Sequence, residues 1–277
     1  MWACAILSDL VRHVKLLAML AVCSSSISAA TIQVVVPWPP GGQVDMFGRS
    51  VARHLTQALG TDAIVINRPG ADGRIGVDWA AAQPPDGNTL LISNTSSHIF
   101  NRVLFRNLAT PVTVWHNMVP MIRTPVVMAV SNQLAVTTWS EFLRVARSRP
   151  LNCAGSGAST VFVGKYMMRQ LGIDSVQFVP FRGTSDMITQ LVAGNLDCAF
   201  ETRFLTATLA QEQKLRVLAV SSQNPDPLAP EGRRFQDTVP GLVFYNWSGV
   251  SMLTTVNPDQ RNRVFAALRG MAQDAQA

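Results

Sequence analysis

Two turns rich in glycine and hydroxyl side chains contain the residues best suited to chemistry in this sequence. PPGG at 39–42 follows a β-branched run at 34–36, and GSG at 155–157 follows a second apolar segment. Apolar residues at helical spacing come after the first turn, so it is predicted to join a strand to a helix. Backbone N–H groups are free at such a junction and form a ready anion site. The alternative is a structural turn with nothing bound.

Nucleotide binding and hydrolysis are the enzyme-like alternatives for the second turn. A third glycine at the required spacing and an acidic residue about twenty positions further on are both missing, which argues against a dinucleotide cradle. Ser156 could act as a nucleophile with His98 or His116 as its base. The G-x-S-x-G elbow is absent, however, and nothing in the sequence assembles a triad.

Composition narrows the class of partner. The 277-residue chain is 48% hydrophobic and 14% charged, which allows one large domain or two modest ones around a sizeable core. Its net charge is +6, but Arg and Lys are scattered and not interleaved with aromatic residues, so we expect no nucleic-acid partner. A basic balance suits small anionic ligands. The histidines are isolated from the cysteines, so we expect no metal site.

The N-terminus has the pattern of a secretory signal peptide. Arg12 and Lys15 precede an apolar core at 16–22 that is too short to span a membrane, and SAA at 28–30 fits a cleavage site. We therefore expect a signal peptide over residues 1–30 and a periplasmic location, with a lipid anchor on Cys23 as the less favoured alternative. Cys153 and Cys198 remain after cleavage, and we expect both to be free thiols because cross-strand geometry rarely suits a disulfide.

Alternating strands and helices predict the fold. Strands expected at 34–36, 63–66 and 89–92 alternate with helices at 44–59 and 75–82, which is typical of a parallel α/β unit. A second set of elements runs from residue 125 to residue 220. Polar turns follow several of these strands, and open parallel sheets bind ligands at that edge. Neutral N–H groups and hydroxyls there would suit a carboxylate.

Seven ordered segments resemble the tripartite tricarboxylate transporter receptor family, the Bug-type periplasmic solute-binding proteins. They are VVPWPPGGQVD at 35–45, INRPGADGRIG at 66–76, PPDGNTLLIS at 84–93, CAGSGAST at 153–160, VPFRGTSDMITQLVAGNLDCAF at 179–200, LRVLAVSS at 215–222 and NWSGV at 246–250. The resemblance implies a type II Venus-flytrap fold of two lobes, each a mostly parallel sheet flanked by helices. Lobe 1 would comprise residues 31–127 and 249–277, and lobe 2 residues 128–248.

The resemblance also implies a ligand site between the lobes. Its residues by match are Pro40, Gly41, Gly42, Asp45, Ser93, Thr95, Gly155, Ser156, Gly157, Ser159, Thr160, Phe181, Gly183 and Thr184. Asp45 has a structural alternative, since it could cap its own helix. Val44, Cys153, Val161 and Phe181 replace residues that carry a hydroxyl or an imidazole in the family. With Trp38 nearby, these changes predict a ligand with an apolar or aromatic body.

The expected function is therefore that of a receptor. We expect a monomer without catalytic residues, metal or cofactor that binds a small carboxylate and delivers it to integral membrane permease subunits. A secreted hydrolase, or a solute sensor that serves a signalling kinase, are the alternatives. Apolar residues at helical spacing predict a helix within residues 259–277. The family carries more sequence after Asn257-Pro258, so we also expect a first lobe with weaker hydrogen-exchange protection than the second.

Overall fold

The structure is a computed structural model that describes residues 31–181, 183–229 and 233–273. The predicted signal peptide and Cys23 lie outside the described residues, as does Arg182 of the segment at 179–200. Within these ranges, none of the helices has the length and apolar character needed to cross a membrane.

The first sheet is built around the β-branched run. Residues 34–36 are fully buried, and their strand β1 pairs in parallel with β2 and with β3. The helix α9 packs on α2, where His54 Nε2 lies 2.9 Å from the carbonyl oxygen of Ala267. The elements of this lobe are β1 (Ile32–Val36), α2 (Gln43–Leu59), β2 (Ala63–Asn67), α3 (Arg74–Ala81), β3 (Thr89–Asn94), α4 (Asn101–Leu104) and α9 (Pro258–Gln273).

The second sheet repeats this pattern. Its strand β5 pairs in parallel with β6 on one side and with β7 on the other. Thr138 and Glu141 form a capping box that starts α5. The elements are α5 (Trp139–Ser148), β5 (Leu151–Gly155), α6 (Ala158–Gln170), β6 (Val176–Val179), α7 (Thr184–Ala193), β7 (Cys198–Thr202), α8 (Arg203–Gln211) and β8 (Leu215–Val220).

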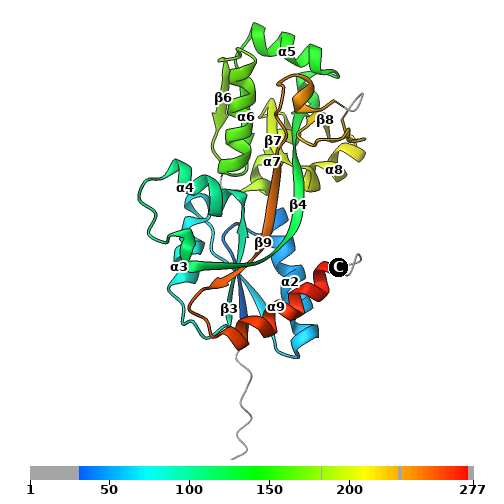
Figure 1. Cartoon of the computed structure of the whole chain (residues 1–277). Helices are drawn as coiled ribbons and strands as arrows, with labels where there is room; N and C mark the ends of the chain where they lie inside the picture. Colours follow the sequence, from blue (N-terminus) through cyan, green and yellow to red (C-terminus); the bar gives the residue numbers. More distant parts are fainter. Residues whose placement is uncertain (1–30, 182, 230–232, 274–277) are drawn as a thin grey trace, which may run out of the picture. The chain divides into compact units, whose positions relative to one another are not determined.

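Two long antiparallel strands connect the sheets. They are β4 (Trp115–Ser131) and β9 (Tyr245–Leu253), which lie side by side between the lower and upper parts of Figure 1. β9 also pairs with β3, whereas the far end of β4 pairs with β7 and β8. The sequence predicts this strand only over residues 125–130, so the prediction misses the part of β4 before Pro125. The structure accommodates this stretch with register shifts near residues 118 and 121.

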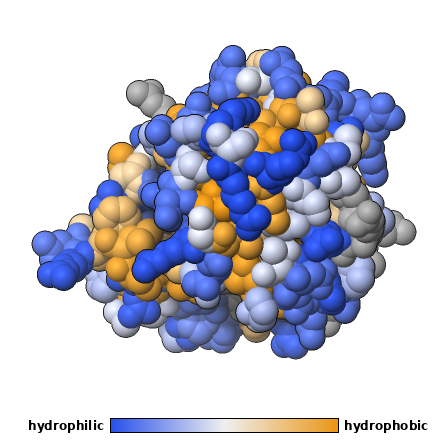
Figure 2. Space-filling model, turned by 90° about the horizontal axis from the view of Figure 1, so that it is seen from above, coloured by the Kyte–Doolittle hydropathy of each residue, from blue (hydrophilic) through white to orange (hydrophobic). Residues whose placement is uncertain are grey.

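Separate hydrophobic cores lie on the two sides of this connection. One core draws its buried residues from 32–115 and 250–271, and two others draw theirs from 126–239. Some apolar side chains remain outside, such as Val103, which is 77% exposed. The face in Figure 2 shows apolar surface in several places between hydrophilic side chains.

The prediction of free thiols is wrong. Cys153 of β5 and Cys198 of β7 form a disulfide, and both are fully buried. The two strands are parallel neighbours, and their register sets these residues directly opposite each other with Cα atoms 4.5 Å apart. That separation lies within the range a disulfide accepts. Strand adjacency and register supply this contact, and neither could be read from the cysteine spacing.

Residues 93–97, which follow the strand predicted at 89–92, do not form an irregular loop. Ser93 and Asn94 complete β3, and a short π-helical turn runs over Ser96–Phe100. Asn94 makes this turn possible, because its Oδ1 accepts the backbone N–H of Ser97 at 2.9 Å while its own N–H donates to Ser97 Oγ at 3.2 Å. Hydroxyl side chains that looked like loop residues are therefore held in fixed positions.

Candidate functional site

A polar cavity lies where turns of both lobes meet. Its walls come from the loop before α2, the end of β3, the turn between β5 and α6, the start of α7, the end of β7 and the first part of β9. The lining residues are Trp38, Pro39, Gly42, Gln43, Val44, Asn94, Ser96, Ser156, Gly157, Ser159, Thr160, Gly183, Thr184, Glu201, Thr202, Asn246, Trp247 and Ser248.

Asp45 fixes the first-lobe wall of this cavity. It is buried, and its carboxylate accepts hydrogen bonds from the backbone N–H of Gly41 at 3.0 Å, from Arg49 Nε at 2.9 Å and from Asn67 Nδ2 at 2.8 Å. Asn67 also donates to the carbonyl oxygen of Trp38 at 3.1 Å. Burial favours a raised pKa for Asp45, but these hydrogen bonds outweigh it and lower the pKa. Asp45 therefore holds the turn in place as an ionised group.

The turn at 155–157 forms the opposing wall. Gly157 donates its N–H to Thr160 Oγ1 at 3.2 Å, and the Thr160 hydroxyl donates to the Gly157 carbonyl oxygen at 3.0 Å. A Cβ atom on Gly157 would lie 3.1 Å from the ring of Trp38 and 3.2 Å from Ser96 Oγ. Only glycine lets the two walls approach this closely without displacing either neighbour.

Hydroxyl groups connect the walls on one side of the cavity. Ser159 Oγ accepts a 2.9 Å hydrogen bond from the Ser96 hydroxyl, and the Ser159 backbone N–H donates to Ser96 Oγ at 3.2 Å. The Ser159 hydroxyl also donates to Asn246 Oδ1 on β9 at 2.8 Å. Three segments far apart in sequence are thus joined at a single serine.

The electrostatics of the cavity come from dipoles and one acid. Helices α6, α7 and α8 all begin beside it, and helix N-termini favour negative charge. Among the described residues that line it, none is Arg, Lys or His, and Glu201 is the one side chain that carries an acid. An incoming anion would therefore meet N–H and hydroxyl donors without a salt bridge.

Glu201 is the most unusual group in the cavity. It is 2% exposed, and its Oε1 accepts both the backbone N–H of Thr202 at 2.7 Å and the Thr202 hydroxyl at 3.0 Å. Its Oε2 is buried without a hydrogen-bond partner in the described part of the chain. Burial raises the pKa of Glu201, although the nearby hydroxyls of Ser156 and Thr184 and the hydrogen bonds from Thr202 act in the opposite direction.

A second, more apolar cavity adjoins the first. The two share Trp38, Pro39, Ser156 and Gly157. The remaining lining of the second cavity consists of Pro69, Gly70, Ala71, Asp72, Gly73, Leu104, Gly155, Ala158, Val161, Phe162, Lys165, Pro180, Phe181 and Asp186. Two of the four replaced positions, Val161 and Phe181, therefore lie together in one cavity, and Val44 lines the polar one.

The predicted site residues fall into three groups. Those that line the polar cavity are Gly42, Ser156, Gly157, Ser159, Thr160, Gly183 and Thr184. Gly155 and Phe181 line the apolar cavity beside it. The others hold the walls or lie further away: Asp45 binds the first turn, Ser93 and Thr95 hydrogen-bond to β9, Gly41 faces Ser185, and Pro40 is exposed in the first turn. A role of these residues in ligand binding stays a prediction.

Several cavity residues were not predicted from the sequence. Glu201 and Thr202 end β7, and they enter the site because β7 lies beside β5. Asn246 and Trp247 enter on β9, which returns from the second sheet to the first. A polar residue at the end of a strand was an available signal for Glu201, but only strand order tells which such ends share one cavity.

The hydrolase alternative gains no support from the geometry. His98 Nδ1 lies 3.1 Å from Ser97 Oγ, its own neighbour, and not from Ser156. Burial lowers the pKa of His98 to about 4, so the imidazole is neutral at physiological pH. Across the described residues, no cluster of three or more His, Cys, Asp or Glu side chains could hold a metal ion.

The chain is similar in sequence and in structure to several known proteins. BugT of Bordetella pertussis is 28% identical over 205 residues, which is 71% of this chain and 62% of BugT. A solved structure of a periplasmic transporter is 26% identical with a TM-score of 0.83, covering 89% of this chain and 84% of that one. MatC from Rhodopseudomonas palustris, solved with bound malate, is 25% identical with a TM-score of 0.80, covering 88% and 84%.

These likenesses confirm the predicted α/β fold of two lobes, which is that of periplasmic binding proteins. The chain spans about two thirds of the length of the curated relatives that it matches. The family model of the tripartite tricarboxylate transporter family receptor matches residues 47–269. The chain belongs to the tripartite tricarboxylate transporter receptor family.

Proposed function

We propose that this protein captures a small carboxylate in the polar cavity and presents it to a membrane permease of the tripartite tricarboxylate type. The observation that carries the proposal is a cavity beside several helix N-termini that Ser and Thr hydroxyls line, with no cationic side chain among its described lining residues. Such donors bind a carboxylate through backbone and hydroxyl hydrogen bonds. The malate bound to MatC, a relative of the same fold, supports this class of ligand.

The adjoining cavity suggests where the rest of the ligand lies. Val161, Phe162 and Phe181 give it apolar walls, and Trp38 lines both cavities. A carboxylate held by the polar cavity could therefore extend an apolar or aromatic body past Trp38. Burial of such a body contributes roughly 25 cal/mol per Å² of apolar surface.

Export and lobe division belong to the same proposal. The signal-like N-terminus supports a periplasmic protein, and the family supports a permease partner. The separate cores support a division into lobe 1 at 31–127 and 249–277 and lobe 2 at 128–248. The protein would act as a binding monomer and carry out no chemical step.

A thermal-shift panel tests the proposal. Malate, adipate and benzoate are compared with glucose and with NaCl at matched ionic strength. At least one carboxylate is expected to raise Tm, because ligand at about a hundredfold excess over Kd stabilises the folded state by about 2.7 kcal/mol. A melt that no member of an extended carboxylate panel moves would contradict the proposal.

Gly157→Val locates the binding site. The added side chain would collide with Trp38 and Ser96, so we expect loss of carboxylate binding while the fold survives. Gly42→Val, whose Cβ would lie 3.6 Å from Thr184 Oγ1, should weaken binding less. Gly270→Val, on the exposed face of α9, is the matched control and should bind normally. Unchanged affinity in Gly157→Val, measured by calorimetry, would place the ligand elsewhere.

A further inference from the structure

A buried acid is an unexpected feature in a site that receives an anion. Two carboxylates that share a site repel each other unless one of them holds a proton. Glu201 lies among the donors that would serve an incoming carboxylate, since the cavity contains it together with Ser156 and Thr184. Its protonation state therefore decides what this site can bind.

The hydrogen bonds around Glu201 fit a neutral carboxylic acid. Oε1 accepts two donors from Thr202, as the carbonyl oxygen of an acid would. Oε2 has no donor directed at it from any described residue, which suits an O–H group that needs an acceptor. The hydroxyls of Ser156 and Thr184 are close enough to influence the acid, but neither makes a hydrogen bond of acceptable geometry to Oε2.

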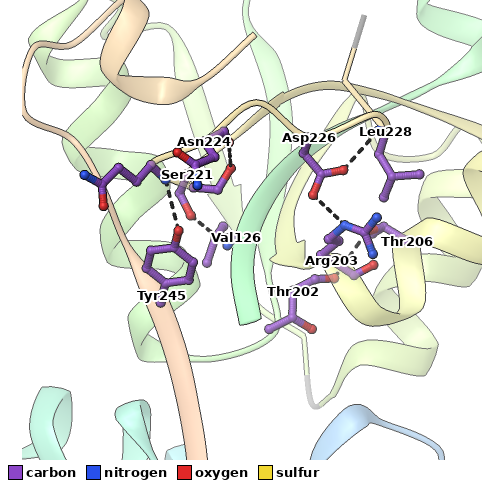
Figure 3. Close-up of polar contacts among 11 residues, drawn as sticks. Val126, Thr202, Arg203, Thr206, Ser221, Asn224, Asp226, Leu228 and Tyr245 are labelled. Atoms are coloured by element: carbon purple, nitrogen blue, oxygen red, sulfur yellow. Dashed lines mark hydrogen bonds and ion pairs between the residues drawn. The ribbon is translucent and has the colours of Figure 1, made fainter. Parts of the chain in front are cut away.

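The charged groups on the elements around Glu201 are paired with other residues or line the adjoining cavity. Arg203, two positions along on α8, binds Asp226 at 2.6 Å, and Figure 3 shows its guanidinium directed at that carboxylate. Lys165 of α6 and Asp186 of α7 line the apolar cavity. On the first-lobe side Asp45 is paired with Arg49, and His98 is neutral.

Strands β4 and β5 add no titratable side chain to the described cavity lining. Burial is thus the largest influence on the acid, and the hydrogen bonds that oppose it do not reverse the rise in its pKa.

We propose that Glu201 donates a hydrogen bond from a protonated Oε2 to an oxygen of the bound carboxylate, so that the site binds the anion only while Glu201 holds its proton. This inference rests on the proposed function and adds a residue that selects the ligand. The proton stays on Glu201 or is shared with the ligand oxygen, and no bond other than this hydrogen bond forms. A ligand ammonium group, which would need an ionised Glu201, is the competing occupant.

Calorimetric titration of malate, adipate and benzoate at pH values on both sides of neutrality tests the inference. Wild-type affinity should fall by up to tenfold per pH unit above the pKa of Glu201, because only the protonated acid donates. Glu201→Gln, whose amide donates at every pH, should bind with an affinity that does not depend on pH and should exceed the wild type in alkaline buffer. Glu212→Gln, an exposed site on the same lobe, is the control and should follow the wild type.

The outcomes separate the two proposals. Binding that is confined to the cavity but insensitive to pH in the wild type would overturn the role of Glu201 and leave the proposed function intact. A second outcome is an affinity that rises with pH, requires an amino group on the ligand and is lost in Glu201→Gln. This outcome would overturn the proposed hydrogen bond from a protonated Glu201 and would indicate that Glu201 is ionised. Failure of every carboxylate to bind the wild type would overturn both.

Discussion

Asp45 and Glu201 are two buried carboxyls beside one cavity: Asp45 holds its first-lobe wall in place, Glu201 lines the opposite wall, and their hydrogen-bond partners differ. Asp45 has three donors, one of them the cation of Arg49, and its pKa is lowered. Glu201 has donors on one oxygen only, and its pKa is raised. Burial disfavours the charged form of both acids, but Glu201 is the more deeply buried and has no cationic partner among the described residues, so its pKa is raised whereas that of Asp45 is lowered. The acid with the lowered pKa holds the first turn, and the acid with the raised pKa keeps one oxygen without a partner among the described residues.

Removal of Asp45 should cause the largest loss of folding stability. Asp45→Ala leaves the N–H of Gly41 and the amide of Asn67 without their acceptor, so we expect the free energy of unfolding to fall by about 2–3 kcal/mol. Urea denaturation measures this loss, with Asp62→Ala at an exposed site of the same lobe as the control. If Asp45→Ala and Asp62→Ala were equally stable, Asp45 would not hold the first turn, and its contrast with Glu201 would be lost.

The contribution of Asp45 should also depend on pH in a defined direction. Its folded-state pKa lies below the unfolded value of 3.8, so its stabilisation is present above that value and disappears as pH falls through the folded pKa. The stability difference between the wild type and Asp45→Ala should therefore be constant near neutrality and shrink in acid. A difference that grows in acid would contradict this sign.

Glu201→Gln should act in the opposite direction. Because the folded-state pKa is raised above the ordinary value of 4.5, the wild type loses stability as pH rises from 4.5 to the folded pKa. The glutamine does not titrate, so the variant should be more stable than the wild type at neutral pH. Thermal melts across a pH series should show the two proteins converging in acid. A less stable variant at neutral pH would mean that Glu201 is ionised there.

Arg49→Gln should cause the smallest change in folding stability. The Arg49 side chain is 54% exposed, and ion pairs at the surface contribute about 0–1 kcal/mol. Asp45 also keeps its bonds from Gly41 and Asn67 in this variant. Chemical denaturation at low and high salt should show a loss below about 1 kcal/mol that salt reduces further. A loss as large as that of Asp45→Ala would show that the ion pair, not the turn, is the main partner.

The same contrast shows how far sequence reasoning reaches. Residues 34–59 are predicted well because the strand, the glycine turn and the helix are local patterns, and Asp45 lies within them. Glu201 and the Cys153–Cys198 disulfide depend on β7 lying beside β5 in register, which no local pattern contains. The sequence predicts only the 125–130 part of β4, whereas the earlier part pairs with the distant strand β9. Contacts between distant strands thus account for most of what the sequence leaves open.

The most direct test is a carbon-13 NMR titration of the side-chain carboxyls, with Glu201→Gln to assign the resonance. We expect Glu201 to be protonated at neutral pH without ligand. When a stabilising carboxylate saturates the protein, the Glu201 carboxyl resonance should shift but remain that of a protonated acid. A Glu201 that is ionised at neutral pH, or whose resonance does not move at saturation, would contradict the claim that this cavity receives a carboxylate beside a neutral acid.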